Sequence, residues 1–222
     1  MVDVAGARVV AVLSRAPSSG GKTRLFAALG RAPDPQLLES LLLDTLDGAA
    51  APGVTRVVSV TPAAACDEIA SLIPPGIGVM PQSTGDLGER MHSLFTSLFA
   101  AGARAVVLIG SDLPAITPSI VAAAFERLDR DLGALVLGPA ADGGYYLIGA
   151  TRVPPVFDRI EWGSDAVLAQ TRAAAAIAGL RVSLVNRLAD VDTPDALERV
   201  AEALPASRTA RWARCPGSGG LA

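Results

Sequence analysis

Residues 105–112 of this 222-residue chain read Ala-Val-Val-Leu-Ile-Gly-Ser-Asp. Five consecutive apolar residues predict a β-strand that is buried on both faces, as in the middle of a parallel sheet. A carboxylate that leaves such a strand lies at the edge of the sheet where α/β proteins bind their ligands. The stretch therefore predicts an α/β fold and makes Asp112 the first candidate for an acidic site.

The same pattern recurs on both sides of this stretch. Further strands are predicted at residues 9–13, 57–60, 77–80, 134–137, 145–148 and 181–185. Helices are predicted at residues 22–29, 36–50, 63–72, 86–101, 117–128, 164–180 and 194–204. Strands separated by helices indicate crossover units and a mostly parallel sheet. We expect one domain over residues 1–204 and a disordered tail over 205–222, which is rich in Arg, Gly and Ser.

Composition excludes several classes of function. A net charge of -3 does not fit a nucleic-acid-binding protein, and no apolar run approaches the roughly 20 residues of a membrane helix. The single histidine, His92, excludes multi-histidine zinc sites and disfavours a serine triad. A metal would therefore rest on carboxylates, which favours Mg²⁺ or Mn²⁺. Two cysteines in so long a chain make no disulfide scaffold, and we expect a cytoplasmic protein.

The loop after the first strand reads Ser-Arg-Ala-Pro-Ser-Ser-Gly-Gly-Lys-Thr-Arg over residues 14–24. Paired glycines let backbone N–H groups point at an anion, and Arg15, Lys22 and Arg24 bring three cations to the start of a helix. We interpret the loop as a phosphate-binding site that contacts the substrate through these three side chains. Two alternatives remain open, a solvated turn and the P-loop of a nucleoside triphosphatase, whose final Gly-Lys-Thr is present.

Two further aspartates follow the last predicted strand. Asp190 and Asp192 share one side of the chain if their segment is extended, with Val191 turned to the core. Together with Asp112 they form a candidate metal site, because clustered carboxylates repel one another unless a cation is present. The alternatives are structural. Asp192 or Thr193 can cap the helix that starts at Pro194, and Asp112 can begin a turn.

The remaining polar stretches supply candidates for substrate binding. Gln82 and Arg90 flank a predicted helix start at which Asp86 and Glu89 fit a capping pair.

Residues 142–146 read Asp-Gly-Gly-Tyr-Tyr, and paired glycines before a strand suit close approach of the backbone to a ligand. Here Asp142 is a candidate catalytic base or acceptor contact, and Gly143, Gly144 and Tyr145 are candidate substrate contacts. Trp162 is a candidate stacking platform, with packing as the alternative.

Taken together, these segments resemble a bacterial family of candidate glycosyltransferases long labelled a domain of unknown function and associated with arsenosugar biosynthesis. The resemblance extends over about residues 9–197. It rests on the order and spacing of five segments, at residues 15–25, 85–91, 110–114, 138–149 and 190–194. The family resembles nucleotide-diphospho-sugar transferases of the GT-A type, a Rossmann-like three-layer fold with a mostly parallel mixed sheet. It is also similar to phospholactate guanylyltransferases, and this similarity implies Asp112, Asp190 and Asp192 as metal ligands, with Asp112 also catalytic.

The favoured function is the metal-dependent transfer of a sugar from a nucleotide diphosphate sugar to a small acceptor. The alternative is nucleotidyl transfer to a phosphorylated small molecule, because both reactions use the same set of residues. A P-loop nucleoside triphosphatase and a nucleotide-binding protein without catalysis are further alternatives. Expected partners are the nucleotide substrate and the acceptor, with neither nucleic acid nor membrane, and the sequence does not define an oligomeric state.

Overall fold

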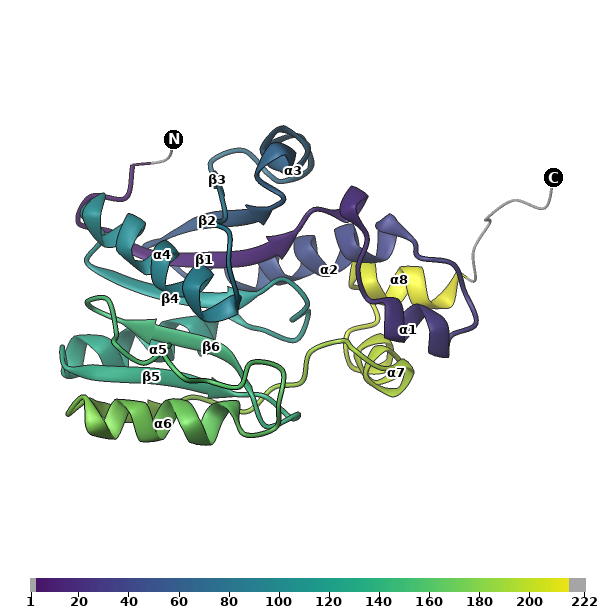
Figure 1. Cartoon of the computed structure of the whole chain (residues 1–222). Coiled ribbons are helices and arrows are strands. Elements are labelled where there is room, and N and C mark those ends of the chain that lie inside the picture. Colours follow the sequence, from purple (N-terminus) through teal and green to yellow (C-terminus); the bar gives the residue numbers. More distant parts are fainter. Residues whose placement is uncertain (1–2, 216–222) are drawn as a thin grey trace.

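The computed structural model describes residues 3–215 and contains one seven-stranded sheet with the strand order β3-β2-β1-β4-β6-β5-β7 (Figure 1). The strands are β1 (Arg8–Arg15), β2 (Val54–Thr61), β3 (Gly78–Pro81), β4 (Ala105–Gly110), β5 (Ala134–Pro139), β6 (Tyr145–Ala150) and β7 (Arg181–Leu184). The longer helices are α1 (Thr23–Ala28), α2 (Pro35–Gly48), α3 (Cys66–Leu72), α4 (Leu87–Ala100), α5 (Pro118–Arg130), α6 (Val167–Ile177), α7 (Pro194–Ala203) and α8 (Arg208–Arg214). Two short 3₁₀ turns, η1 (Pro17–Ser19) and η2 (Ala63–Ala65), complete the chain.

The sheet is mixed because one strand runs against the others. β1 pairs in parallel with both β2 and β4, and β5 pairs in parallel with β7. β6 lies between β4 and β5 and is antiparallel to both. The predicted α/β class with a mostly parallel mixed sheet is therefore confirmed.

Helices cover both faces of the sheet, which is why its central strands are apolar throughout. Val10 and Val12 face a core formed with α2, α3 and α5, whereas Val9 and Ala11 face a second core formed with α4 and α6. In Figure 1, α4 lies in front of the sheet and α5 behind it. The consecutive valines of β1 are all fully buried, as expected for a strand with apolar neighbours on both faces.

Polar caps begin several helices where the sequence predicts them. Asp86 accepts a hydrogen bond from the Glu89 N–H, and the Glu89 carboxylate accepts one from the Asp86 N–H, so the predicted capping box at α4 is confirmed. At α7, the hydroxyl of Thr193 accepts from the Ala196 N–H, and Pro194 occupies the first turn. Thr193 is therefore the cap of α7, and Asp192 is left free for another role.

The predicted disordered tail is wrong for residues 205–215, which include α8. The buried carboxylate of Asp44, in α2, accepts hydrogen bonds from the backbone N–H groups of Arg208 and Thr209 and from the Thr209 hydroxyl. The indole N–H of Trp212 donates to Asp34 at 2.7 Å. These tertiary contacts hold a segment whose Arg-rich composition suggests disorder. Residues 216–222 lie outside the described residues.

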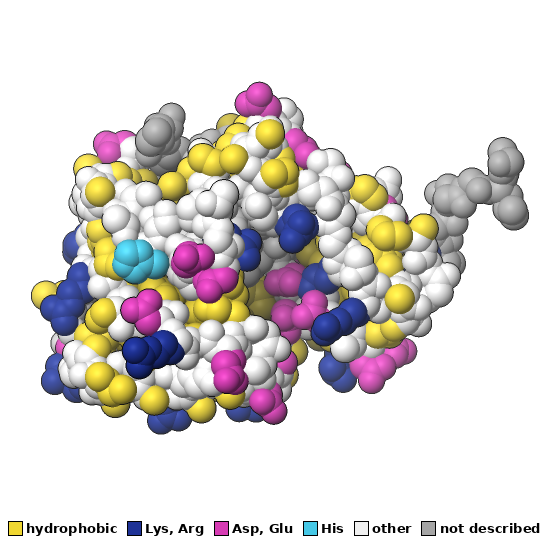
Figure 2. Space-filling model, in the orientation of Figure 1, with side chains coloured by type: hydrophobic (Ala, Val, Ile, Leu, Met, Phe, Trp, Pro, Cys, Tyr) yellow, Lys and Arg dark blue, Asp and Glu magenta, His cyan; other side chains and the backbone are white. Residues whose placement is uncertain are grey.

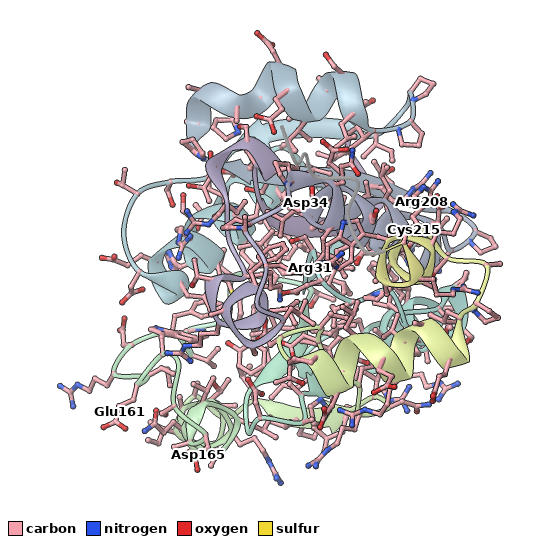
Figure 3. All side chains as sticks on the ribbon, turned by 90° about the vertical axis from the view of Figure 1, so that its right-hand side faces the viewer. Arg31, Asp34, Glu161, Asp165, Arg208 and Cys215 are labelled. Carbon is pink, nitrogen blue, oxygen red and sulfur yellow. The ribbon has the colours of Figure 1, made fainter. Side chains whose placement is uncertain are left out.

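Helices α1, α7 and α8 form a small group at one end of the sheet, on the right of Figure 1. Leu25 and Phe26 of α1 pack with α2, α7 and Trp212 in a third apolar cluster. Figure 3 shows this end of the molecule, with Arg31 and Asp34 beside the helix that carries Arg208. Within residues 3–215, no helix combines the length and the hydropathy that crossing a bilayer requires.

Candidate active site at the carboxyl edge of the sheet

Segments from both halves of the chain meet at the edge of the sheet where the parallel strands end. Asp112 follows β4, and Asp190 and Asp192 follow β7. One carboxylate oxygen from each lies within 4.8 Å of the others. Figure 2 shows acidic and basic side chains meeting in a hollow at the centre of the molecule, beside the α1 and α7 end. The three aspartates therefore converge at one point, as predicted.

Backbone and hydroxyl contacts fix the turn that carries Asp112. The fully buried Thr45 donates its hydroxyl hydrogen to the Ser111 carbonyl at 3.1 Å and accepts the Leu113 N–H at 3.0 Å. The Val191 N–H donates to the Asp112 carbonyl at 3.2 Å, which ties the second acidic segment to the first. The side chain of Val191 is fully buried, so Asp190 and Asp192 turn away from the core, as predicted.

Lys22 places its ammonium group within the acidic cluster. Its Nζ forms ion pairs with the carboxylates of Asp112 and Asp192, and its side chain is only 11% exposed. Lys22 adopts the left-handed conformation at φ 50°, directly after Gly20 at φ 68° and Gly21 at φ 154°. The two glycines let the loop turn sharply, and the turn sends the lysine into the cluster rather than along the first turn of α1.

Burial and the charges of the cluster shift the pKa values of Lys22, Asp190 and Asp192. Burial alone would lower the pKa of Lys22, but the negative charges of Asp112 and Asp192 outweigh it and raise the pKa above its ordinary value. Burial and the neighbouring carboxylates raise the pKa of Asp190 to about 7. Burial acts in the same direction on Asp192, but the charge of Lys22 prevails and lowers its pKa. Lys22 offsets only part of the negative charge, so the cluster still favours an additional cation.

A basic pocket of about 650 Å³ opens on one side of the cluster. The side chains of Arg15, Lys22 and Arg24 line it together with Gly20 and Gly21. Three cations and two conformationally free glycines in one hollow suit phosphate groups, as the sequence predicts. The lysine of the loop points at carboxylates, so the geometry gives no support to the P-loop alternative.

A second, smaller pocket of about 260 Å³ lies on the other side of the cluster; we call it the apolar pocket. Its walls include Leu87 and Met91 of α4, and Tyr145 and Trp162. The pocket is also lined by Asp112, Asp142, Gly144, Ser164 and Asp190. Among the described residues, no Lys or Arg lines this pocket. Asp112 lines both pockets, so the two hollows meet at the cluster.

Two of the predicted substrate contacts, Gln82 and Arg90, bind other groups of the protein. The amide of Gln82 donates to the carbonyls of Ser14 and Ser59, at 3.0 and 2.7 Å. Arg90 reaches the Gln82 side-chain oxygen at 3.3 Å, and neither residue lines the basic or the apolar pocket.

Gly143 has φ 91°, and a Cβ atom there would lie 2.2 Å from the Asp165 carbonyl oxygen. This glycine allows two loops to pack. Its predicted contact with substrate stays a prediction.

Asp142 lies at the exposed mouth of the apolar pocket. One of its carboxylate oxygens accepts the Gly144 N–H at 2.9 Å, and the other is free to meet a ligand. The hydroxyl of Tyr145 is buried near Thr171, and burial raises its pKa well above the ordinary value. Tyr145 therefore presents its ring rather than an ionisable oxygen to the pocket.

Two residues of the site escape prediction from the sequence. Thr45 holds the Asp112 turn, yet it lies among leucines in α2; the interruption of those leucines by Asp44 and Thr45 was the available signal. Ser164 lines the apolar pocket, although the sequence indicates it only as a helix cap. Its hydroxyl accepts the Ala166 N–H at 3.3 Å within the turn before α6. The N-cap of α6 is Ala166, so the predicted cap at Ser164 is wrong.

Comparisons with known proteins agree with this geometry. Residues 45–164 match a family described as uncharacterized protein conserved in bacteria (DUF2064). A 3-phospho-D-glycerate guanylyltransferase from Phenylobacterium zucineum (strain HLK1) is 30% identical over 211 residues, which cover 90% of this chain and 93% of that protein.

Solved structures of other proteins are also similar to this chain. A candidate nucleotide-diphospho-sugar transferase from Desulfovibrio desulfuricans G20 matches with a TM-score of 0.84 at 30% identity, with 94% of each chain covered. A CMP:2-keto-3-deoxy-manno-octonic acid synthetase complexed with CTP matches with a TM-score of 0.58 at 14% identity, covering 90% of this chain and 99% of that one. This last likeness concerns the fold alone. The predicted family resemblance and fold class are both confirmed.

Proposed function

This chain belongs to the bacterial family DUF2064, and we propose from that premise that it is a nucleotidyltransferase that joins a nucleotide to a phosphorylated small molecule. One observation carries the proposal. The cluster of Asp112, Asp190 and Asp192, with Lys22 inside it, lies between a basic pocket and a smaller apolar pocket. Such an arrangement supports a reaction that joins two substrates at a phosphate.

The geometry supports a division of the substrates between the two pockets. Arg15, Lys22 and Arg24 suit the triphosphate of a nucleotide, because its β- and γ-phosphates carry most of the charge. In an in-line displacement, the attacking and leaving oxygens lie on opposite sides of the reacting phosphorus. If the pyrophosphate leaves toward the basic pocket, the acceptor enters from the apolar pocket, and the α-phosphorus lies beside Asp112.

The proposed reaction needs no general base. A phosphate oxygen of the acceptor forms a bond to the α-phosphorus of the nucleoside triphosphate. The bond from that phosphorus to the bridging oxygen breaks, and pyrophosphate leaves with the electron pair. Since a phosphate monoester is largely dianionic at neutral pH, the attacking oxygen carries no proton that must be removed. Lys22 and the two arginines stabilise the charge that develops on the leaving group.

The cluster fits a divalent cation. Its donors are three carboxylate oxygens within 4.8 Å of one another, and oxygen donors are those that Mg²⁺ and Mn²⁺ prefer. We propose that Asp112, Asp190 and Asp192 hold this ion. When bound, it would withdraw charge from the phosphate oxygens and so favour attack at phosphorus. Burial, together with the charges of Asp192 and Asp112, raises the pKa of Asp190 to about 7, and the negative charge that Lys22 leaves unbalanced supports the same proposal.

Nucleotidyl transfer is better supported than the sugar transfer that the sequence favours. The 30% identical relative that aligns over nine-tenths of this chain is a guanylyltransferase, and the CTP-bound structure shares the fold. The solved protein from Desulfovibrio desulfuricans G20 keeps sugar transfer as a second candidate. A hydroxyl acceptor in that reaction would need a base, and Asp142 at the mouth of the apolar pocket is the residue in place for it.

Release of pyrophosphate tests the proposal. The protein is incubated with each of the four ribonucleoside triphosphates, with 3-phospho-D-glycerate as acceptor and Mg²⁺ or Mn²⁺ present. We expect stoichiometric pyrophosphate and a nucleoside diphosphate-linked product with one of the triphosphates, and no product after chelation by EDTA. A matched control is Asp112→Asn, which keeps the shape of the side chain and removes its charge.

Two results would contradict nucleotidyl transfer. One is the absence of pyrophosphate with every triphosphate across a panel of phosphorylated acids and sugar phosphates. The other is release of a nucleoside diphosphate from a nucleotide sugar at a rate that depends on an unphosphorylated acceptor. The second result would establish the glycosyltransferase alternative.

A further inference from the structure

A third hollow lies directly behind one wall of the apolar pocket. This outer pocket has a volume of about 440 Å³ and is lined by Asp86, Glu89, His92, Asp158 and Arg159, among others. Trp162 lines both the apolar and the outer pocket. Its indole therefore stands between a hollow of about 260 Å³ and one of about 440 Å³.

The indole is seated tightly in this position. A Cβ atom added to Gly88 in α4 would lie 2.8 Å from the indole Nε1 and Cζ2 atoms, so only glycine lets the ring reach the helix. The ring of Tyr145 also meets the indole edge-on, with 6.4 Å between centroids and an interplanar angle of 81°. The indole is thus in contact with both α4 and β6.

The backbone that carries Trp162 is held without help from the indole. The Trp162 N–H donates to the Ile160 carbonyl, and the Ser164 N–H donates to the Glu161 carbonyl. The Glu161 N–H donates to the side chain of Gln170 in α6 at 2.8 Å. Glu161 and Asp165 are exposed, and in Figure 3 both lie at the outer surface beside α6. Removal of the ring should therefore open the wall without displacing the loop.

We propose that Trp162 sets the size limit of the acceptor, by closing the apolar pocket against the outer pocket. A hollow of about 260 Å³ is smaller than the 300–1,000 Å³ typical of pockets for drug-sized ligands, and so suits a phosphorylated acceptor of only a few carbons. Without the indole, the acceptor would extend past Gly88 into the outer pocket. This inference rests on the proposed function, because it assigns the acceptor to the apolar pocket.

The charge of the outer pocket defines which larger acceptors would enter. Asp86, Glu89 and Asp158 bring three carboxylates, against the single guanidinium of Arg159. An uncharged sugar extension is compatible with this lining, whereas a second phosphate group would be repelled. The structure therefore assigns to the open form a phosphorylated oligosaccharide rather than a bisphosphate.

The test compares Trp162→Ala with wild type on acceptors of graded size. The acceptors are 3-phospho-D-glycerate, trehalose 6-phosphate and fructose 1,6-bisphosphate. For the variant we expect kcat/KM with trehalose 6-phosphate to rise by about tenfold or more, and kcat/KM with 3-phospho-D-glycerate to fall. Trp162→Phe, which keeps a smaller ring, should lie between the two. Leu87→Ala is the matched control, because Leu87 lines the apolar pocket but not the outer one.

Several results would overturn the inference. One is a variant that keeps its activity on 3-phospho-D-glycerate and gains none on trehalose 6-phosphate, while wild-type nucleotidyl transfer stands. Equal gains for Leu87→Ala and Trp162→Ala, or for the bisphosphate and the disaccharide phosphate, would place the extension outside the outer pocket. Isothermal titration of trehalose 6-phosphate into nucleotide-bound wild type and Trp162→Ala measures the same size limit through binding, without turnover. Unchanged binding there would contradict the inference even if the proposed reaction failed.

Discussion

The ammonium group of Lys22 contacts the carboxylate of Asp112 across 90 residues of sequence, and it contacts Asp192 at the same time. The lysine thereby holds the loop of residues 14–24 against the acidic cluster. It also occupies part of the space and charge that a metal ion would use. If the proposed cation binds, Lys22 would compete with it for Asp112 and Asp192, and its ammonium group would then be released toward phosphate.

Replacing Lys22 by Ala should separate these two roles. We expect Mn²⁺ to bind the nucleotide-free variant about tenfold more tightly, because a competing positive charge is removed from Asp112 and Asp192. The affinity for nucleoside triphosphate should fall by a similar factor. Isothermal titration measures both. Arg24→Ala is the control: it should weaken nucleotide binding and leave Mn²⁺ binding nearly unchanged. Equal Mn²⁺ affinity in Lys22→Ala and wild type would show that the ion pairs do not compete with metal.

Neighbouring substitutions at the start of α7 should have opposite effects. Asp192→Asn should abolish metal-dependent nucleotide binding and leave the free energy of unfolding almost unchanged, since the Asp192 side chain is 56% exposed and does not cap the helix. Thr193→Ala should cost about 1 kcal/mol of stability through loss of the cap, with metal binding retained. Urea unfolding measures the stability of both variants, and Mn²⁺ titration measures their metal binding. Loss of stability in Asp192→Asn with normal metal binding would favour a capping role instead.

Asp142→Asn distinguishes the two candidate reactions. A phosphate acceptor has no proton to lose, so we expect kcat to change less than about tenfold in nucleotidyl transfer. A hydroxyl acceptor would need the base, and kcat would fall by about 10²–10⁴. Steady-state rates with saturating substrates provide the comparison. A large loss with 3-phospho-D-glycerate as acceptor would show that Asp142 takes part in the chemistry proposed here.

Asp44→Ala should destabilise the protein by about 3 kcal/mol. The side chain of Asp44 is only 7% exposed and accepts hydrogen bonds from two backbone N–H groups, a hydroxyl and the Arg208 guanidinium, and the first three of these would lose their partner. Asp47→Ala is the control, because the Asp47 side chain is 55% exposed and its ion pair with Arg208 should contribute less than about 1 kcal/mol. Denaturant unfolding compares the two, and similar losses would contradict the anchoring role of Asp44.

The ion pair of Asp131 with Arg181 should give a small pH-dependent contribution at β7. The hydrogen bond from Arg181, followed by the Gly133 N–H, lowers the pKa of Asp131 below its ordinary value of 3.8. Since the folded pKa is the lower one, the contribution is complete above pH 3.8 and is lost as the pH falls through the lowered pKa. We expect Arg181→Ala to lower Tm slightly at pH 7 and not at pH 2. A difference that grows toward low pH would contradict this sign.

Periodicity in the sequence was sufficient to predict the sheet and the acidic cluster. Val9 to Val12 and residues 105–109 are apolar because helices cover both faces, and this pattern survives in the sequence without any tertiary information. Asp112 was predictable from the rule that ligands bind where parallel strands end. Asp190 and Asp192 followed from the two-residue repeat of an extended segment.

Other features depend on contacts between distant residues and left no local signal. The reversal of β6 is set by its place between β4 and β5, not by its own composition. α8 exists because Asp44 and Asp34 receive its polar groups. Gln82 was expected at the substrate, but its amide joins the ends of two strands instead. The direction of Lys22 required the backbone conformation at φ 50°.

The ion pair between Lys22 and Asp192 spans 170 residues, so the acidic cluster is completed late in the synthesis of the chain. At about 5–20 residues per second, the ribosome takes on the order of ten seconds or more to reach the acidic partner after the loop has emerged. Through that interval the nascent chain can form β1 and its neighbours, but the acidic cluster is incomplete and α8 has not yet packed against α2. Chains that stop before Asp190 should therefore fold in part and lack the proposed site.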